Sequence, residues 1–111
     1  MAVSDALGMG DAVRYANELS EKQYPGENLN QRGDALRHLL WQGALQQQYG
    51  DIPAAAVGWA HELGDADAAE KEMDTFNNEL GRQLGSEAAT KEELLQHAID
   101  AINQGKAKTI E

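Results

Sequence analysis

The chain has 111 residues, nine basic and nineteen acidic, and a formal net charge of −10. One domain around a single hydrophobic core is the natural expectation at this length. The acidic excess argues against general binding to nucleic-acid backbones, which requires clustered lysine and arginine. The absence of cysteine excludes disulfides, thiolate metal ligands and a cysteine nucleophile. No stretch approaches the roughly 20 apolar residues of a membrane span.

Apolar residues recur at helical spacing along almost the whole chain, and runs of β-branched residues are missing. The first predicted helix covers residues 11–23, after which Pro25 and Gly26 break the pattern. The second covers residues 31–49, and Gly50 is expected to end it in the left-handed conformation that glycine tolerates. A glycine inside this second helix, Gly43, predicts that another helix approaches closely at that point.

The third helix is predicted over residues 52–63, with Asp51 as its N-cap and Gly64 at its end. Its high alanine content favours a position in the middle of the domain. One face of this helix is therefore expected to be buried: Ile52, Ala55, Ala56, Trp59 and Leu63.

The fourth helix is predicted over residues 66–84, between an Asp65 cap and Gly85. Its core stripe has steps of three or four residues: Ala66, Ala69, Met73, Phe76, Leu80 and Leu84. The fifth helix, over residues 91–104, opens with a capping box that starts at Thr90. The pattern predicts an all-α fold, a compact bundle of about five helices in one domain over residues 1–111. Residues 106–111 are expected to form a mobile tail.

An acid, a guanidinium, an imidazole and an indole lie within two turns of the second predicted helix. They are Asp34, Arg37, His38 and Trp41. Asp34 and His38 are four residues apart and therefore share a helix face, as Arg37 and Trp41 do. A carboxylate at this spacing can hold the imidazole ring in place. The alternative is a histidine that only fills a helix interface.

His61 and Glu62 lie at the end of the third predicted helix. A histidine at a helix C-terminus is often there only because the helix dipole stabilises its charged form. Adjacent helical residues point about 100° apart, so both side chains can reach one site only at its edge. No second histidine follows Glu62 at four-residue spacing, and the helix motif of zinc proteases is therefore absent.

A polar stripe runs beside the core stripe of the fourth predicted helix. It contains Asp74 and Asn77, and Asn78 follows directly. Asparagine is a poor residue in mid-helix because its amide competes for backbone hydrogen bonds. Two of them beside core positions predict specific hydrogen bonds, which either bind a substrate or tie helices together. The third histidine, His97 on the last helix, is expected to be exposed.

Three interpretations fit these residues, and two of them are catalytic. Imidazole nitrogens and carboxylate oxygens suit zinc, manganese or another divalent ion, with His38, His61 and Asp74 as the ligands and water as the nucleophile. Without a metal, one histidine could act as general base, with Asp34 and Glu62 as further catalytic carboxylates and asparagine amides polarising an oxygen. The third is a hydrogen-bonded internal network without chemistry.

The polar residues form three blocks in a fixed order and spacing: GDAxRHxxW at residues 33–41, AHE at 60–62 and MDxxNNxxGR at 73–82. In this combination the chain resembles a family of small helical domains of unknown function. Such domains occur in bacterial and phage proteins, some of them secreted or toxin-like. The resemblance covers about residues 28–85 and carries no established reaction. It implies one site or one buried network made of Asp34, Arg37, His38, Trp41, His61, Glu62, Asp74, Asn77 and Asn78.

The function therefore has two main hypotheses, and whether the protein is an enzyme stays open. The first is a phage or virion-associated binding or structural module that contacts a protein partner, with Arg37, Trp41, Asn77 and Asn78 in its polar network. The alternative is a small metal-assisted hydrolase acting on a phosphoester, lipid or cell-wall bond. A third is an acidic inhibitor of a nucleic-acid-binding protein. Because no signal peptide is visible, we expect a cytoplasmic or virion location.

Overall fold

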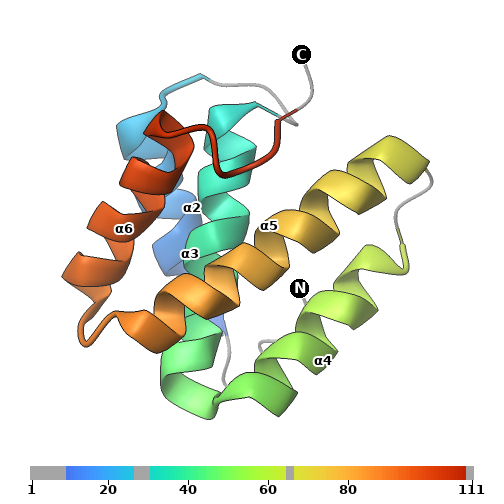
Figure 1. Ribbon diagram of the computed structural model, residues 1–111, viewed down its shortest axis with the longest axis horizontal. Helices are drawn as coiled ribbons and strands as arrows, with labels where there is room; N and C mark the ends of the chain where they lie inside the picture. Colours follow the sequence, from blue (N-terminus) through green and yellow to red (C-terminus); the bar gives the residue numbers. More distant parts are fainter. Residues whose placement is uncertain (1–9, 27–30, 65–66, 110–111) are drawn as a thin grey trace.

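The computed structural model describes residues 10–26, 31–64 and 67–109, and all regular secondary structure in these ranges is helical. Its helices are α2 (Gly10–Gln23), α3 (Arg32–Tyr49), α4 (Asp51–Glu62), α5 (Ala68–Glu87) and α6 (Lys91–Asn103), as Figure 1 shows. The prediction of an all-α bundle of about five helices is confirmed. None of the described helices is long and apolar enough to cross a membrane.

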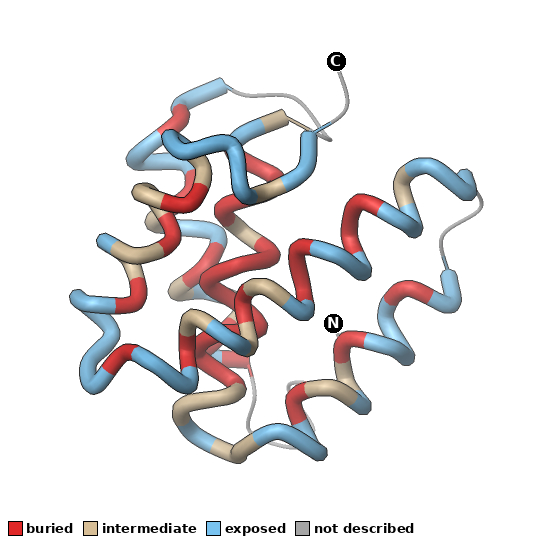
Figure 2. The backbone as a smooth tube through the Cα atoms, viewed as in Figure 1, coloured by how far each residue is buried: buried red, intermediate tan, exposed pale blue. Residues whose placement is uncertain are grey.

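The central helix of the bundle is α3. It packs against α2, α4, α5 and α6, most extensively against α5. Figure 2 shows it buried along most of its length. A helix enclosed on all sides is expected to be apolar or small around its circumference. Most of α3 fits this rule, but Asp34, His38 and Gln42 are buried with the leucines. These polar side chains must find their partners inside the bundle.

Two glycines of α5 set its distance from α3. A Cβ on Gly81 would lie 2.7 Å from the main-chain oxygen of Leu39, and a Cβ on Gly85 would lie even closer to that of Gly43. Both collisions are with backbone, which cannot rotate aside. The expectation that Gly43 admits a close neighbour is confirmed. The prediction that Gly85 ends a helix is wrong, because this glycine serves the crossing and α5 continues beyond it.

A single residue, Gly50, separates α3 from α4. Its φ of 88° lies in the left-handed region, as predicted, and its N–H donates to the Gln46 carbonyl at 3.0 Å. Gly50 is also the N-cap of α4. Asp51 is therefore the first residue of that helix and not its cap, which corrects the prediction.

Side chains cap α5 and α6. Asp67 precedes α5 and accepts hydrogen bonds from the N–H groups of Ala69 and Glu70. The helix thus begins two residues later than expected, and the predicted cap Asp65 lies outside the described residues. Thr90 caps α6 as predicted, since its hydroxyl accepts from the N–H of Glu93 at 3.1 Å.

The position of α4 is at the edge of the bundle, not in its middle as predicted. Only Ala54, Gly58 and Glu62 are buried along it, at steps of four residues. The predicted apolar face points outward instead, with Ile52 83% exposed and Trp59 69% exposed. The apolar stripe of this helix therefore does not mark its contact with the core.

Residue size explains the orientation of α4. A Cβ on Gly58 would lie 2.6 Å from the amide oxygen of the Gln42 side chain on α3. Small residues on this face of α4 allow the axes of α3 and α4 to lie close together. If the indole of Trp59 occupied this face instead, it would hold the two helices apart. The bulky side chains consequently lie on the other faces of α4.

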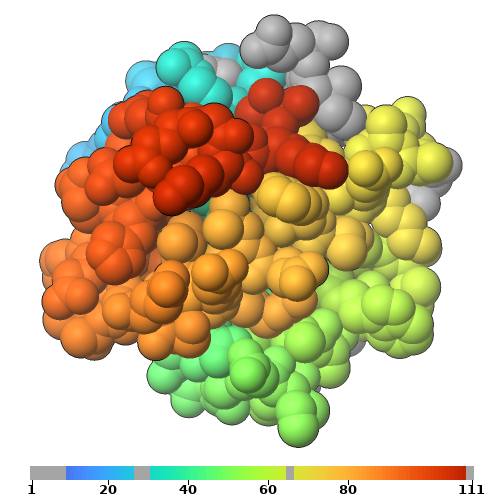
Figure 3. Space-filling model, viewed as in Figure 1, coloured from blue at the N-terminus to red at the C-terminus, as the bar shows by residue number. Residues whose placement is uncertain are grey.

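The end of the described chain lies against α5, as the red segment in Figure 3 shows. The main chain of Lys108 donates to Asn77 Oδ1 at 2.9 Å and accepts from Asn77 Nδ2 at 2.8 Å. The Lys108 ammonium lies 4.6 Å from the ring centre of Phe76, which is 40% exposed and not in the core as predicted. The mobility of residues 106–111 stays a prediction.

Candidate functional site

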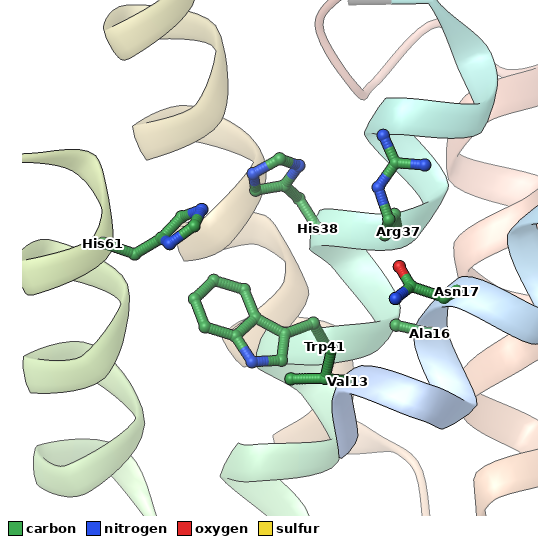
Figure 4. A pocket seen from close by; sticks show the side chains of 7 residues that line it. All are labelled: Val13, Ala16, Asn17, Arg37, His38, Trp41 and His61. Atoms are coloured by element: carbon green, nitrogen blue, oxygen red, sulfur yellow. The ribbon is translucent and has the colours of Figure 1, made fainter. Parts of the chain in front are cut away.

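A cavity of about 300 Å³ opens between α2, α3 and α4. Figure 4 shows its side chains: three come from α2, three from α3 and one from α4. They are Val13, Ala16, Asn17, Arg37, His38, Trp41 and His61. His38 is buried and His61 is exposed, so the cavity connects a buried imidazole with the surface.

His38 is held in one orientation by its own helix. Its Nδ1 lies 3.0 Å from the main-chain oxygen of Asp34, one turn earlier. Since a carbonyl only accepts, Nδ1 carries the hydrogen, and in the neutral ring Nε2 offers the lone pair. That Nε2 lies 3.7 Å from Asp74 Oδ1 and 4.0 Å from Glu62 Oε2. The outer nitrogen of His38 therefore faces carboxylates from two other helices.

Asp34 supports this arrangement from the opposite side of the ring. Its carboxylate is almost fully buried and lies 3.5 Å from His38 Nδ1. Arg37 donates to the same carboxylate at 2.6 Å, and its own side chain is 38% exposed. The spacings of three and four residues make both contacts a direct result of helix geometry. The contact of Asp34 with the His38 ring is the one that the spacing predicts.

His61 and Glu62 reach the cluster from α4. The His61 ring lies 5.2 Å from the Trp41 indole and 6.2 Å from the His38 imidazole, measured between ring centres. Glu62 is buried beside them and accepts a hydrogen bond from the amide nitrogen of Asn78 on α5. His61 thus enters the cluster from its exposed edge and Glu62 from its interior, because adjacent helical residues point about 100° apart.

Two sets of side chains bring possible metal-ligand atoms within 4.8 Å of one another. They are His38 with His61 and Glu62, and Asp34 with His38 and Asp74. The first set fits one ion better, because Nδ1 of His38 is used by the main chain and only the Nε2 side can receive a metal. Glu62 and Asp74 lie on that side, whereas Asp34 lies beside Nδ1 and is bound by Arg37.

The spacing of these atoms is slightly wider than a bound ion requires. Zinc ligands at about 2.1 Å in a tetrahedral arrangement lie about 3.4 Å apart. The atoms of His38, His61 and Glu62, all within 4.8 Å of one another, would therefore have to close by about 1 Å. Movements of this size are available to the exposed His61 side chain.

The structure separates the two asparagines that the sequence pairs. Asn78 contacts Glu62 in the cluster, but both ends of the Asn77 amide bond to Lys108 on another face of α5. Asp74 and Trp41 lie beside His38 as expected. His97 is only partly exposed on α6 and belongs to neither of the two metal-ligand sets.

Sequence reasoning missed the wall that α2 contributes. Val13, Ala16 and Asn17 share one face of that helix at steps of three and one residues. Their spacing predicts that this face packs on a neighbour, but their side chains carry no chemical signature of a cavity. Arg82, the last residue of the third sequence block, has no predicted role there, and it donates to the buried Gln42 at 2.6 Å.

The comparison with protein-family models supplies the family. The model described as "Domain of unknown function (DUF6973)" matches residues 3–106, which include every helix described above and all the residues of the cluster. No match was found among curated proteins or among solved structures. The significance of the three sequence blocks and a bacterial or phage origin stay predictions. Because the match extends over nearly the whole length, the chain belongs to the DUF6973 family, a domain of unknown function.

Proposed function

We propose that this domain is a small hydrolase that works with one divalent cation bound by His38, His61 and Glu62. One observation carries the proposal: ligand atoms of these three side chains from two helices converge within 4.8 Å of one another. Two of the three side chains also line the cavity, so a ligand can reach them. An internal network that only stabilises the fold would have no need of this access.

The ligand set suits a catalytic ion. Two imidazoles and one carboxylate are typical ligands of zinc and other first-row divalent cations. Three protein ligands leave at least one coordination position for water or substrate, which distinguishes catalytic zinc sites from structural ones. A cation bound there would polarise water and supply a nucleophile near neutral pH.

The groups around the ligands support the same proposal. Histidine ligands generally donate their second N–H to a carbonyl or carboxylate, which fixes the ring. His38 has this arrangement with the Asp34 carbonyl at 3.0 Å, and Glu62 is oriented by Asn78. Both buried ligands are thus held in position before an ion arrives, and little rearrangement is needed on binding.

Asp74 is suited to handle the proton. Its carboxylate oxygen lies 3.7 Å from His38 Nε2, on the side where the ion would bind. In ester hydrolysis the water oxygen bonds to phosphorus or to the carbonyl carbon, and the bond to the leaving oxygen breaks. Asp74 would accept the proton that water loses, and the leaving oxygen would then receive it.

Cation binding is the first test. The purified chain is titrated with zinc, manganese and calcium by calorimetry, and unfolding is followed in parallel. We expect one zinc or manganese ion per chain, with stabilisation of about 2.7 kcal/mol at a free concentration of 100 Kd. His61→Ala should weaken binding by at least about tenfold, whereas His97→Ala on α6 serves as the matched control and should bind like the wild type.

Hydrolysis is the second test. The cation-loaded wild type is offered bis(p-nitrophenyl) phosphate and p-nitrophenyl acetate, and release of nitrophenol is recorded. Asp74→Asn should lower the rate by about 10²-fold or more while the cation still binds. A wild-type chain that binds no cation, or a His61→Ala variant that binds it equally well, would contradict the proposal. The phage or virion-associated module would then be the better hypothesis.

A further inference from the structure

The cavity has a chemical character that the cation ligands do not explain. We propose that it binds the phosphate group of an ester whose other substituent is apolar, with Arg37 and Asn17 as the phosphate contacts. This inference rests on the proposed function, because it assigns the substrate class of the same site. The evidence comes from the charges, the donors and the size of the cavity wall.

The charge of the wall is opposite to that of the protein. The chain has nineteen acidic and nine basic residues, yet the side chains that line the cavity include Arg37 and no carboxylate. One nitrogen of this guanidinium donates to Asp34 at 2.6 Å. A guanidinium carries five N–H donors, so it retains the capacity to bind a phosphate oxygen while it holds the carboxylate.

The wall combines hydrogen-bond donors with apolar surface. Asn17 on α2 and Arg37 on α3 both line the cavity, and Figure 4 draws them on the side of it away from His61. Val13, Ala16 and the indole of Trp41 supply the apolar remainder of the lining. An oxyanion can accept hydrogen bonds from an amide and a guanidinium together. An apolar substituent of the same molecule would contact the aliphatic side chains and the indole.

Electrostatics requires the cation to bind before the phosphate. Three carboxylates stand behind the cavity: Asp34, Glu62 and Asp74. Ionised, they outnumber the single guanidinium and repel an anion from the cation-free centre. A divalent cation would bring this centre to neutrality. By linkage, cation and phosphate must each raise the affinity for the other by the same factor.

The size of the cavity limits the substrate. Its volume of about 300 Å³ lies at the lower end of the range for small-molecule sites. A phosphate with one ring or a short chain matches this volume. The same chemistry could be presented by a soluble ester or by a lipid headgroup with its first methylene groups, and the experiment below separates these sources.

The test uses phenylphosphonate, whose phosphorus–carbon bond resists hydrolysis. It is titrated into the full chain with and without zinc. We expect zinc to tighten binding by at least about tenfold, and phenylphosphonate to raise the zinc affinity equally. Arg37→Gln should lose about tenfold or more of the affinity in the presence of zinc. Arg14→Gln is the control, since Arg14 pairs with Asp11 at the same three-residue spacing but outside the cavity.

Because Arg37 also pairs with a buried carboxylate, replacing it affects folding as well as phosphate binding. A second variant separates these two effects. Asn17→Asp changes an exposed side chain and places a negative charge on the cavity wall that Arg37 also lines. It should weaken phenylphosphonate binding by several-fold, with zinc affinity retained. The other arm measures binding of the chain to vesicles with and without phosphatidic acid. If the chain binds only the vesicles with phosphatidic acid, and Arg37 is required, the phosphate belongs to a lipid. If the chain binds phenylphosphonate but not these vesicles, the phosphate belongs to a soluble ester.

Two results would overturn the inference. One is equal affinity for phenylphosphonate in the zinc-loaded wild type, Arg37→Gln and Asn17→Asp. The other is tighter binding of neutral benzyl alcohol than of phenylphosphonate, which would make the cavity an apolar site. Failure of the wild type to bind zinc is a different result, since it would remove the proposed function itself.

Discussion

The two neighbours of α3 that contribute side chains to the candidate site, α4 and α5, contact it in different ways. Toward α5 the contact is backbone to backbone, with Gly81 against Leu39 and Gly85 against Gly43. Toward α4 it passes through the end of a side chain, because the Gln42 amide lies under Gly58. The first contact allows no adjustment, whereas the second can yield. The candidate site lies across both, with His38 and Asp74 on the rigid pair of helices and His61 and Glu62 on α4.

Hydrogen bonding at the α4 contact is incomplete. Gln42 Nε2 and Asn78 Oδ1 are buried at the α4 contact and have no hydrogen-bond partner among the described residues. Such atoms reduce the net stabilisation that a contact provides. With only three buried residues on α4, we expect this helix to open locally at lower free energy than α3 or α5.

The largest effect is expected from Gly85→Ala, which breaks the rigid contact. The new methyl group collides with the main chain of Gly43, and neither backbone can move without separating α3 from α5. We expect the free energy of unfolding to fall by about 3 kcal/mol or more, measured by urea denaturation.

Gly64→Ala is the matched control at the end of α4. The nearest atom to its new Cβ is the His61 carbonyl oxygen at 3.7 Å, an ordinary contact distance. Its unfolding free energy should change by less than about 0.5 kcal/mol. Equal losses in the two variants would show that the α3–α5 crossing is not special.

Asn78→Ala should affect both the fold and the cation. It removes the amide that donates to the buried Glu62, a bond to a charged group worth about 1.5–3 kcal/mol. Because Glu62 then loses its orientation, zinc affinity should fall about tenfold. Asn77→Ala is the neighbouring control: it loses the bonds to Lys108 and comparable stability, but zinc affinity should be unchanged. A parallel loss of zinc affinity in both would contradict the division of roles.

A smaller effect is expected from Gly58→Ala at the yielding contact. The methyl group displaces the Gln42 amide and weakens its bond from Arg82. That loss of about 1.5–3 kcal/mol is offset by about 1 kcal/mol of improved helix propensity, so the net cost should be about 1 kcal/mol. In a Gln42→Ala background the same substitution should stabilise the protein. A cost that persists there would rule out the Gln42 side chain as its cause.

The smallest effect lies outside both contacts, where Tyr15 of α2 donates to the Lys91 carbonyl at 3.0 Å. Burial, helped by nearby Glu92, raises the pKa of Tyr15 to about 12. An unfolded tyrosine has a pKa of about 10, so above that pH the unfolded state binds fewer protons and stability falls until about pH 12. Denaturation between pH 8 and 11.5 should show a steeper decline in the wild type than in Tyr15→Phe. Identical slopes would contradict the shift.

The fold could be predicted where the evidence is local. Gly50, Thr90 and the breaker after residue 23 place helix ends within a few residues, because caps and left-handed turns depend on a few neighbouring side chains. The contact between Asp34 and His38 follows from helix periodicity alone. These features require no knowledge of how the helices pack.

The rest depends on helix rotation, which the sequence pattern does not determine. The apolar stripe of α4 faces outward because the helix approaches α3 over small residues, and hydrophobicity alone predicts the opposite face. Adjacent asparagines are equivalent in a pattern, but the glycine crossing turns Asn78 toward Glu62 and Asn77 toward Lys108. From the sequence alone, the glycines at these helix contacts predict interruptions of the helices and do not indicate how the helices are rotated.

The single residue between α3 and α4 gives the site a mechanical property. His61 lies about 16 Å along α4 from Gly50, at 1.5 Å of rise per residue. At that distance, a rotation of α4 by about 4° at Gly50 would move His61 by roughly 1 Å. This displacement matches the closing that the proposed ligand atoms would need around an ion. A small rotation at this one glycine, whose φ is 88°, would therefore change the distances from His38 to both His61 and Glu62 at once.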